Sequence, residues 1–171
     1  MEAARYIFKT ELGWVGISSS ANGLRRLGLP RQTYASACEL LDGDDNPVSG
    51  IPPALGDIVE RLNLYFKGYK VAFPDKLDLA GATDFQRKVW EVTRQIPYGE
   101  TRSYTWIAER VGDLNAARAA GQALGSNPLP VIVPCHRVLK RDGRLGGYSG
   151  GLVLKRYLLW LEASAFMRDR T

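Results

Sequence analysis

Two residues that could carry out chemistry are neighbours in the chain, Cys135 and His136. The protein has one histidine and two cysteines, so this pairing joins its only imidazole to one of its two thiols. An imidazole beside a cysteine can take the thiol proton and produce a thiolate nucleophile near neutral pH. A buried, inert thiol is the alternative, because apolar residues precede Cys135 and neighbours in sequence need not touch. Cys38 has no histidine or cationic neighbour, which favours a packing role.

The scarcity of cysteine and histidine argues against a metal centre. A structural zinc site usually needs about four such ligands, and this chain cannot supply them, so we expect no metal and no cofactor. The two cysteines form no disulfide framework, which fits a reducing compartment. Residues 1–10 lack a signal-peptide pattern, and no apolar run reaches the roughly 18 residues of a membrane helix. We therefore expect no membrane partner and a cytoplasmic protein, associated with the nucleoid when bound to DNA.

Charge is distributed unevenly along the chain. Residues 1–80 carry 9 basic and 10 acidic side chains, whereas residues 81–171 carry 14 and 8. This asymmetry suggests an anionic partner for the second half, although a solvated basic surface is an equally good interpretation of charge alone.

The segment from Asn115 to Gly125 predicts a helix with one nearly bare face. Ala117, Gly121 and Gly125 recur at four-residue spacing, and Arg118 is the only long charged side chain. The small residues alone favour tight packing against another helix. A lone guanidinium on such a helix can instead enter a DNA groove or stand where a displaced base was.

The surrounding elements predict an α+β protein of two parts, a small N-terminal α/β domain (1–80) and a winged helix-turn-helix-like domain (81–171). The first is a strand meander plus helices: strands at Arg5–Lys9, Trp14–Ser18 and Leu24–Leu29, a helix at Thr33–Leu41, a loop at Asp42–Pro53 and a helix at Ala54–Phe66. In the second, Thr83 and Gln86 form a capping-box pattern. The elements expected there are helices at Thr83–Ile96, Ser103–Val111 and Asn115–Leu124, a strand pair formed by Val131–Val133 and a hairpin around Asp142-Gly143, and a helix at Leu152–Ala163.

Several motifs in the second half together resemble the O6-alkylguanine-DNA alkyltransferases, the methylated-DNA–protein-cysteine methyltransferase family. The resemblance covers residues 84–162 and rests on Phe85-Gln86, Val89-Trp90, Ile96-Pro97-Tyr98-Gly99-Glu100-Thr101, Ser103-Tyr104, Ala116-Ala117-Arg118-Ala119, Asn127-Pro128, Pro134-Cys135-His136-Arg137-Val138 and Gly147-Tyr148-Ser149-Gly150-Gly151-Leu152. The N-terminal half resembles the family only in general shape. Some members hold zinc there, and this sequence lacks the ligands.

The resemblance implies a reaction and a catalytic set. The alkyl group on guanine O6, and on O4 of thymine, is transferred to Cys135 irreversibly and once per molecule. His136 acts through a water as the base, and Glu162 orients the imidazole. The implied partner is double-stranded DNA containing O6-alkylguanine, bound by a monomer.

The resemblance also implies how DNA and base are held. Arg118 fills the stack after the alkylated guanine rotates out, and Tyr104 presses on the 3′ phosphate and donates to guanine N3. Tyr148 and Ser149 donate toward O6. The remaining implied contacts are the carbonyls of Cys135 and Val138, which accept from the exocyclic amine, and Asn127, which braces the turn before the active-site segment.

Two other functions remain open at the level of the sequence. One is a cysteine hydrolase or acyltransferase that uses Cys135, His136 and Glu162 and turns over many times. The other is a non-catalytic, lesion-binding winged-helix protein. A transcription factor fits less well, because its recognition helix normally carries longer polar side chains that read bases.

Overall fold

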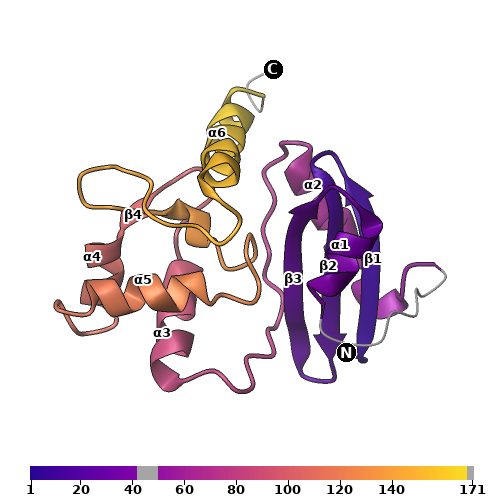
Figure 1. The fold of residues 1–171 in the computed structure, drawn as a ribbon, viewed down its shortest axis with the longest axis horizontal. Helices are drawn as coiled ribbons and strands as arrows, with labels where there is room; N and C mark the ends of the chain where they lie inside the picture. The colour runs from indigo at the N-terminus through magenta and orange to yellow at the C-terminus, as the bar shows by residue number, and fades with distance from the viewer. Residues whose placement is uncertain (42–49, 169–171) are drawn as a thin grey trace. The chain divides into compact units, whose positions relative to one another are not determined.

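The computed structural model describes residues 1–41 and 50–168, and it divides into two compact units, Met1–Leu79 and Ala80–Thr171 (Figure 1). Residues 42–49 of the expected loop lie outside the described residues. The α+β class is confirmed, because helices and small sheets both form. That the two units are the separate domains 1–80 and 81–171 stays a prediction.

The first unit is built on the expected strand meander. The strands β1 (Ala4–Thr10), β2 (Gly13–Ser20) and β3 (Gly23–Arg31) form an antiparallel sheet in that order. Their alternating apolar side chains, including Val15, Ile17 and Leu24, are fully buried. The sheet is accompanied by α1 (Tyr34–Glu39), a 3₁₀ turn η1 (Pro53–Leu55) and α2 (Gly56–Phe66), so both expected helices form, each slightly shorter than expected.

Three helices form the first part of the second unit. The capping box at Thr83 and Gln86 is present and opens α3 (Asp84–Thr93), which ends three residues before the expected Ile96. After the short strand β4 (Arg102–Ser103) come α4 (Tyr104–Arg110) and α5 (Ala117–Gly125), and all three helices pack on one another. The helices expected from the sequence are confirmed, with ends that differ by one to three residues.

The prediction of a strand pair for the wing, formed by Val131–Val133 and a hairpin around Asp142-Gly143, is wrong. Residues 131–133 form a turn in which Val131 has a left-handed backbone, with φ of 74°, and a single bridge joins Pro130 to Val133. The reason is local: the Asn127 side chain accepts from the Leu129 amide and donates to the Val133 carbonyl, which draws the chain into a tight loop. The turn around Asp142-Gly143 does form, but no strands flank it. The strand β5 (Val138–Leu139) instead pairs in parallel with β4.

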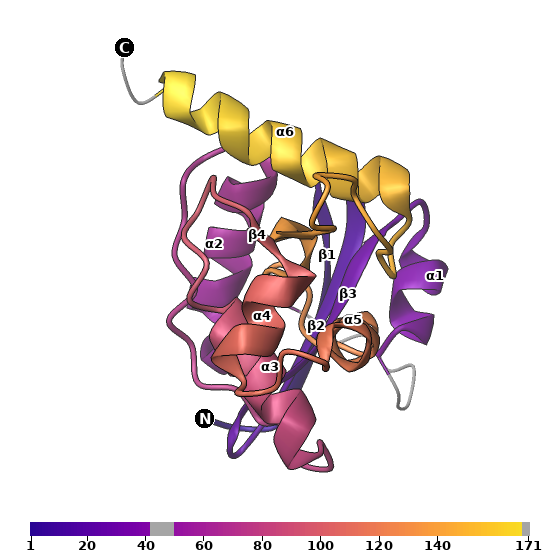
Figure 2. The ribbon, with the colours of Figure 1, turned by 90° about the vertical axis from the view of Figure 1, so that its left-hand side faces the viewer.

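The last helix, α6 (Leu152–Arg168), runs five residues further than expected and lies over the one-turn 3₁₀ helix η2 (Cys135–Arg137) (Figure 2). Its buried side includes two charged residues, Lys155 and Glu162, beside Leu158 and Leu161. Helix α6 therefore brings charge to the segment that carries Cys135. Among the residues that the structure describes, no helix is long and apolar enough to cross a membrane.

Candidate active site and DNA interface

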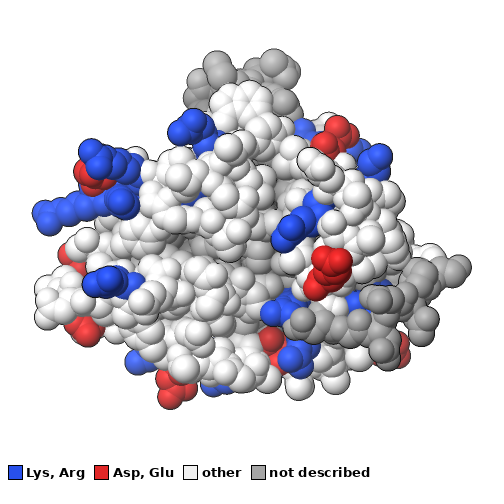
Figure 3. All heavy atoms as spheres, viewed as in Figure 1, with Lys and Arg blue, Asp and Glu red and all other residues white. Residues whose placement is uncertain are grey.

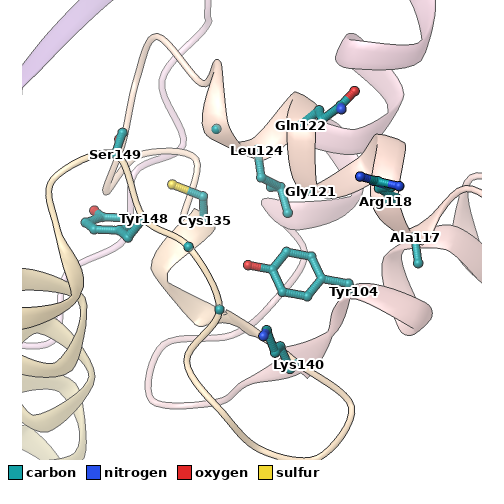
Figure 4. A pocket seen from close by; sticks show the side chains of 13 residues that line it. Tyr104, Ala117, Arg118, Gly121, Gln122, Leu124, Cys135, Lys140, Tyr148 and Ser149 are labelled. Carbon is teal, nitrogen blue, oxygen red and sulfur yellow. The ribbon is translucent and has the colours of Figure 1, made fainter.

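A cavity of about 560 Å³ opens in the second unit next to Cys135. Its walls come from α4, α5, η2 and the loop between β5 and α6, as Figure 4 shows. Five of the predicted catalytic and DNA-binding residues line it: Tyr104, Arg118, Cys135, Tyr148 and Ser149. The tertiary structure thus brings together residues that lie up to 45 positions apart in the chain.

The Cys135 thiol is buried at this cavity and has a hydrogen-bond donor. Asn127 Nδ2 lies 3.2 Å from Cys135 Sγ and also donates to Val133 O at 2.9 Å. Burial raises the pKa of Cys135, and the Asn127 amide and the charge of Lys155 oppose that rise only in part. The resting thiol is therefore protonated near neutral pH, and formation of a thiolate needs a base.

Glu162 is the centre of a buried cluster that joins three segments of the chain. Its carboxylate accepts from Arg137 Nε at 2.8 Å, from Arg137 Nη2 at 3.2 Å and from the Gly99 amide at 3.0 Å. It also pairs with His136 Nε2. Arg137 Nη1 donates to the Ile96 carbonyl at 2.8 Å, so the guanidinium holds the end of the α3 segment as well. The expected partnership of His136 with Glu162 is present in the structure, and Arg137 is part of it.

The protonation states in this cluster follow from burial and charge. Burial alone would raise the pKa of Glu162, but hydrogen bonds and charge from His136 and Arg137 lower it to about 2. Burial lowers the pKa of His136, although Glu162 opposes this, so the imidazole is neutral near pH 7. A neutral ring that donates Nε2–H to Glu162 has its basic nitrogen at Nδ1. The cluster therefore fixes the orientation of a neutral imidazole, whose Nδ1 is able to accept a proton.

Two phenols, those of Tyr104 and Tyr148, line the cavity. Burial raises the pKa of Tyr104, and it raises that of Tyr148 well above its usual value. The Tyr148 hydroxyl is buried without a hydrogen-bond partner among the described residues, which leaves it able to donate to a bound molecule. Gly146 has φ of +70°, and a Cβ there would lie 2.7 Å from the Tyr104 hydroxyl oxygen. Only glycine lets this loop approach the Tyr104 ring so closely.

The structure also places the other residues that were predicted for the site. Arg118 is exposed on α5 and borders the cavity, and Ser149 is exposed on the loop. Gly121, on the bare face of α5, lies against the Tyr104 ring, where an added Cβ would make ordinary contact at 3.7 Å. The Val138 carbonyl accepts from Lys155 Nζ at 2.7 Å.

Sequence reasoning missed two buried cations, Arg137 and Lys155. Lys155 donates to the carbonyls of Val138, Leu145 and Gly147. Burial lowers its pKa to about 8, so it is still mostly an ammonium at pH 7. The sequence contained a signal for the burial of Lys155, since Lys155, Leu158 and Glu162 recur at helical spacing and share one side of α6. Among the described residues, no group of three or more His, Cys, Asp or Glu side chains could hold a metal ion.

Comparison with known proteins identifies a matching family model and similar relatives. The family model described as "6-O-methylguanine DNA methyltransferase, DNA binding domain" matches residues 84–164. The methylated-DNA–protein-cysteine methyltransferase of Mycobacterium tuberculosis (strain H37Rv) is 52% identical over 120 residues, which cover 70% of this chain and 72% of the relative. The constitutive enzyme of the same name from Bacillus subtilis is 36% identical over 159 residues, covering 92% and 94%.

Solved structures agree with the sequence relatives. The crystal structure of Mycobacterium tuberculosis OGT in complex with DNA superposes with a TM-score of 0.78 at 41% identity, covering 94% of this chain and 93% of that one. The O6-methylguanine-DNA methyltransferase of Pyrococcus kodakaraensis has a TM-score of 0.71 at 25% identity, covering 93% and 99%. With relatives this similar over most of their length, the resemblance stated from the motifs is confirmed: the chain belongs to the methylated-DNA–protein-cysteine methyltransferase family.

Proposed function

We propose that this protein repairs double-stranded DNA by moving the alkyl group of O6-alkylguanine to Cys135 Sγ, once per molecule. Alkyl transfer to a cysteine in DNA repair is the activity of its family, and the carrying observation for this assignment is the position of Cys135. Its thiol is buried at a cavity that also presents two protonated phenols, Tyr104 and Tyr148. Cys38 belongs to the other compact unit and is not among the residues that line that cavity. We extend the proposal to O4-alkylthymine, which offers the same kind of oxygen-bound alkyl group.

The transfer is a displacement at the alkyl carbon. His136 Nδ1 takes the Cys135 proton through a water, and Glu162 compensates the positive charge that develops on the ring. Sγ then forms a bond to the alkyl carbon as the carbon–O6 bond breaks. Tyr148 donates a hydrogen bond to the departing oxygen, and the proton needed by the released guanine returns from solvent or the imidazole. The product is a thioether that no side chain of the site can reverse, so each molecule acts once.

A base within a duplex cannot reach this buried thiol, so the alkylated nucleotide must rotate into the cavity. Helix α5 borders the cavity with the small residues Ala117 and Gly121, which let it approach a DNA groove closely. Arg118 projects from the same helix and would occupy the space that the base leaves. Asn127 would brace the turn between α5 and the active-site segment, as the sequence resemblance implies, and its amide also contacts the Cys135 thiol. We propose that the Ser149 hydroxyl and the Cys135 and Val138 carbonyls complete the contacts to the base.

We also propose an oligomeric state, a role for each domain and a cellular location. We infer that a monomer acts, because one chain supplies Cys135, His136 and Glu162 together. The chemistry is assigned to residues 81–171 and a structural role to residues 1–80, and the protein would work in the cytoplasm, on the nucleoid. A cysteine hydrolase or a non-catalytic lesion-binding protein is not favoured by the family to which the chain belongs.

Intact mass spectrometry with an O6-methylguanine duplex tests the proposal directly. The protein should gain one methylene while unmodified duplex is released, and peptide mapping should place the methyl group on Cys135. The matched control is Cys38→Ser, which should behave as wild type. Methylation of Cys38, or turnover of many lesions by protein of unchanged mass, would contradict the proposal.

A further inference from the structure

The exposed face of α5 carries one long uncharged side chain that the proposed function does not use, that of Gln122. The exposed residues of the helix and its C-cap are Arg118, Ala119, Gln122, Gly125 and Ser126. In Figure 3, the surface where Figure 1 draws α5 is largely uncharged. Only Arg118 and Gln122 on this face are long enough to reach the edge of a base within a groove. Gln122 is therefore the side chain that can add hydrogen bonds to the DNA beside the contact made by Arg118.

The Gln122 amide is available to a ligand. It has no hydrogen-bond partner among the described residues, whereas the neighbouring Ser126 hydroxyl accepts from Gln86 Nε2 at 3.2 Å. Gln122 borders the cavity together with Arg118, and Figure 4 shows its amide directed away from the Cys135 thiol. Gln122 therefore belongs to the rim of the cavity and takes no part in the chemistry at the thiol.

Helix geometry gives the position of Gln122 along the DNA. Gln122 follows Arg118 by four residues, so the two side chains leave the same side of α5 about 6 Å apart along its axis. Base pairs follow one another at about 3.4 Å along a duplex. With Arg118 in the space that the flipped base leaves, the Gln122 amide reaches the first or second base pair beyond it. Because the helix runs in one direction, this base pair lies on one side of the lesion only.

The small residues on this face favour the minor groove, which is about 6 Å wide against about 12 Å for the major groove. In the minor groove both kinds of base pair present acceptors, and a G·C pair adds one donor, the exocyclic amine of guanine. A glutamine amide has both a donor and an acceptor. It can therefore make two hydrogen bonds with guanine, one to N3 and one from the amine, but only one with adenine.

We propose that Gln122 gives the protein a preference for lesions with a G·C pair beside them, by accepting a hydrogen bond from the minor-groove amine of that guanine. This inference rests on the proposed function, because it concerns the DNA around the lesion. One such hydrogen bond corresponds to about fivefold in the second-order rate constant of repair. A single contact of this size biases repair toward some sequences, whereas an operator-binding protein needs many such contacts.

The experiment removes each partner of this hydrogen bond in turn. Duplexes carry O6-methylguanine with a G·C pair at the first or second position on either side, and in matched duplexes inosine replaces that guanine, which deletes only the minor-groove amine. The second-order rate constant of repair is measured for wild type and for Gln122→Ala. Gln95→Ala is the control variant, because Gln95 is also exposed but is not among the residues that line the cavity.

The ratio of the guanine rate to the inosine rate should be about fivefold higher for wild type and Gln95→Ala than for Gln122→Ala, on one side of the lesion only. The weaker pairing of inosine affects all three proteins alike and cancels from this comparison. An equal ratio in wild type and Gln122→Ala, an equal fall in Gln95→Ala, or the same effect on both sides of the lesion would each overturn the inference. Failure of wild type to take an alkyl group from any of the duplexes would instead refute the proposed function.

Discussion

Replacing Glu162 with glutamine removes one negative charge from the buried cluster and hardly alters the size of the side chain. The carboxylate is 1% exposed, and its pKa is held at about 2 by His136 and Arg137, against about 4.3 for an ordinary glutamate. A difference of about two pKa units corresponds to about 3 kcal/mol of stability at neutral pH. This agrees with the roughly 3–5 kcal/mol lost when one partner of a buried ion pair is removed.

The sign of the pH dependence follows from the lowered pKa. The native protein holds fewer protons on Glu162 than the unfolded chain does between about pH 4 and pH 2, so its contribution is complete above that range and is lost as pH falls through it. We expect Glu162→Gln to be less stable than wild type by about 3 kcal/mol at pH 7 and by much less near pH 2.5. Urea unfolding of both proteins at the two pH values, followed by tryptophan fluorescence, measures the difference.

The structure offers a matched control in Glu100, whose exposed carboxylate pairs with Arg102 at 3.0 Å. Glu100→Gln should change stability by less than about 1 kcal/mol, because exposed ion pairs contribute little. Glu162→Gln should also slow transfer from free O6-benzylguanine by about 100-fold or more, since the imidazole loses its orienting partner. A Glu162→Gln protein as stable as the Glu100→Gln protein, or a stability difference that is the same at both pH values, would refute the role assigned to the cluster.

Three further substitutions test other parts of the site. Cys135→Ser should abolish transfer but leave lesion binding intact, because a hydroxyl is far less acidic than a thiol; any protein alkylation in a transfer assay would argue against Cys135 as acceptor. Arg118→Ala should slow repair of duplex DNA by about 10- to 100-fold, since flipping costs a few kcal/mol, with little change on free O6-benzylguanine. Equal losses on both substrates would mean that Arg118 supports the fold instead. Gly146→Ala should slow transfer from both substrates, because its Cβ would lie 2.7 Å from the Tyr104 hydroxyl oxygen at a φ of +70°; wild-type rates would show that the loop moves aside freely.

Much of this protein could be predicted from short stretches of sequence, because the relevant forces act locally. The capping box at Thr83 and Gln86 opens α3 as expected, since both hydrogen bonds lie within one turn of helix. The small residues and single arginine of α5 are equally visible in the sequence. The Cys135-His136 pair, together with the motifs around it, was enough to state the family, which the comparisons confirm.

The expected strand at Val131–Val133 shows where local patterns end. Its apolar, β-branched residues favour a strand, but Asn127 binds the backbone on both sides of Val131 and imposes a turn. Side-chain hydrogen bonds of this kind compete with sheet formation. Whether the turn or the strand forms depends on where the fold holds the chain around these hydrogen bonds.

The electrostatic state of the site was decided by the tertiary structure alone. The pKa values of Cys135, His136 and Glu162 depend on how much water the fold excludes and on charges that arrive from α6 and η2. Lys155 illustrates the same point, because the three carbonyls that hold its ammonium lie 8 to 17 residues away in the chain. The sequence determines which side chains are available and which helix face carries them. Only the folded chain determines which of them lose water together, and that loss of water sets the protonation states of the thiol, the imidazole and the carboxylate.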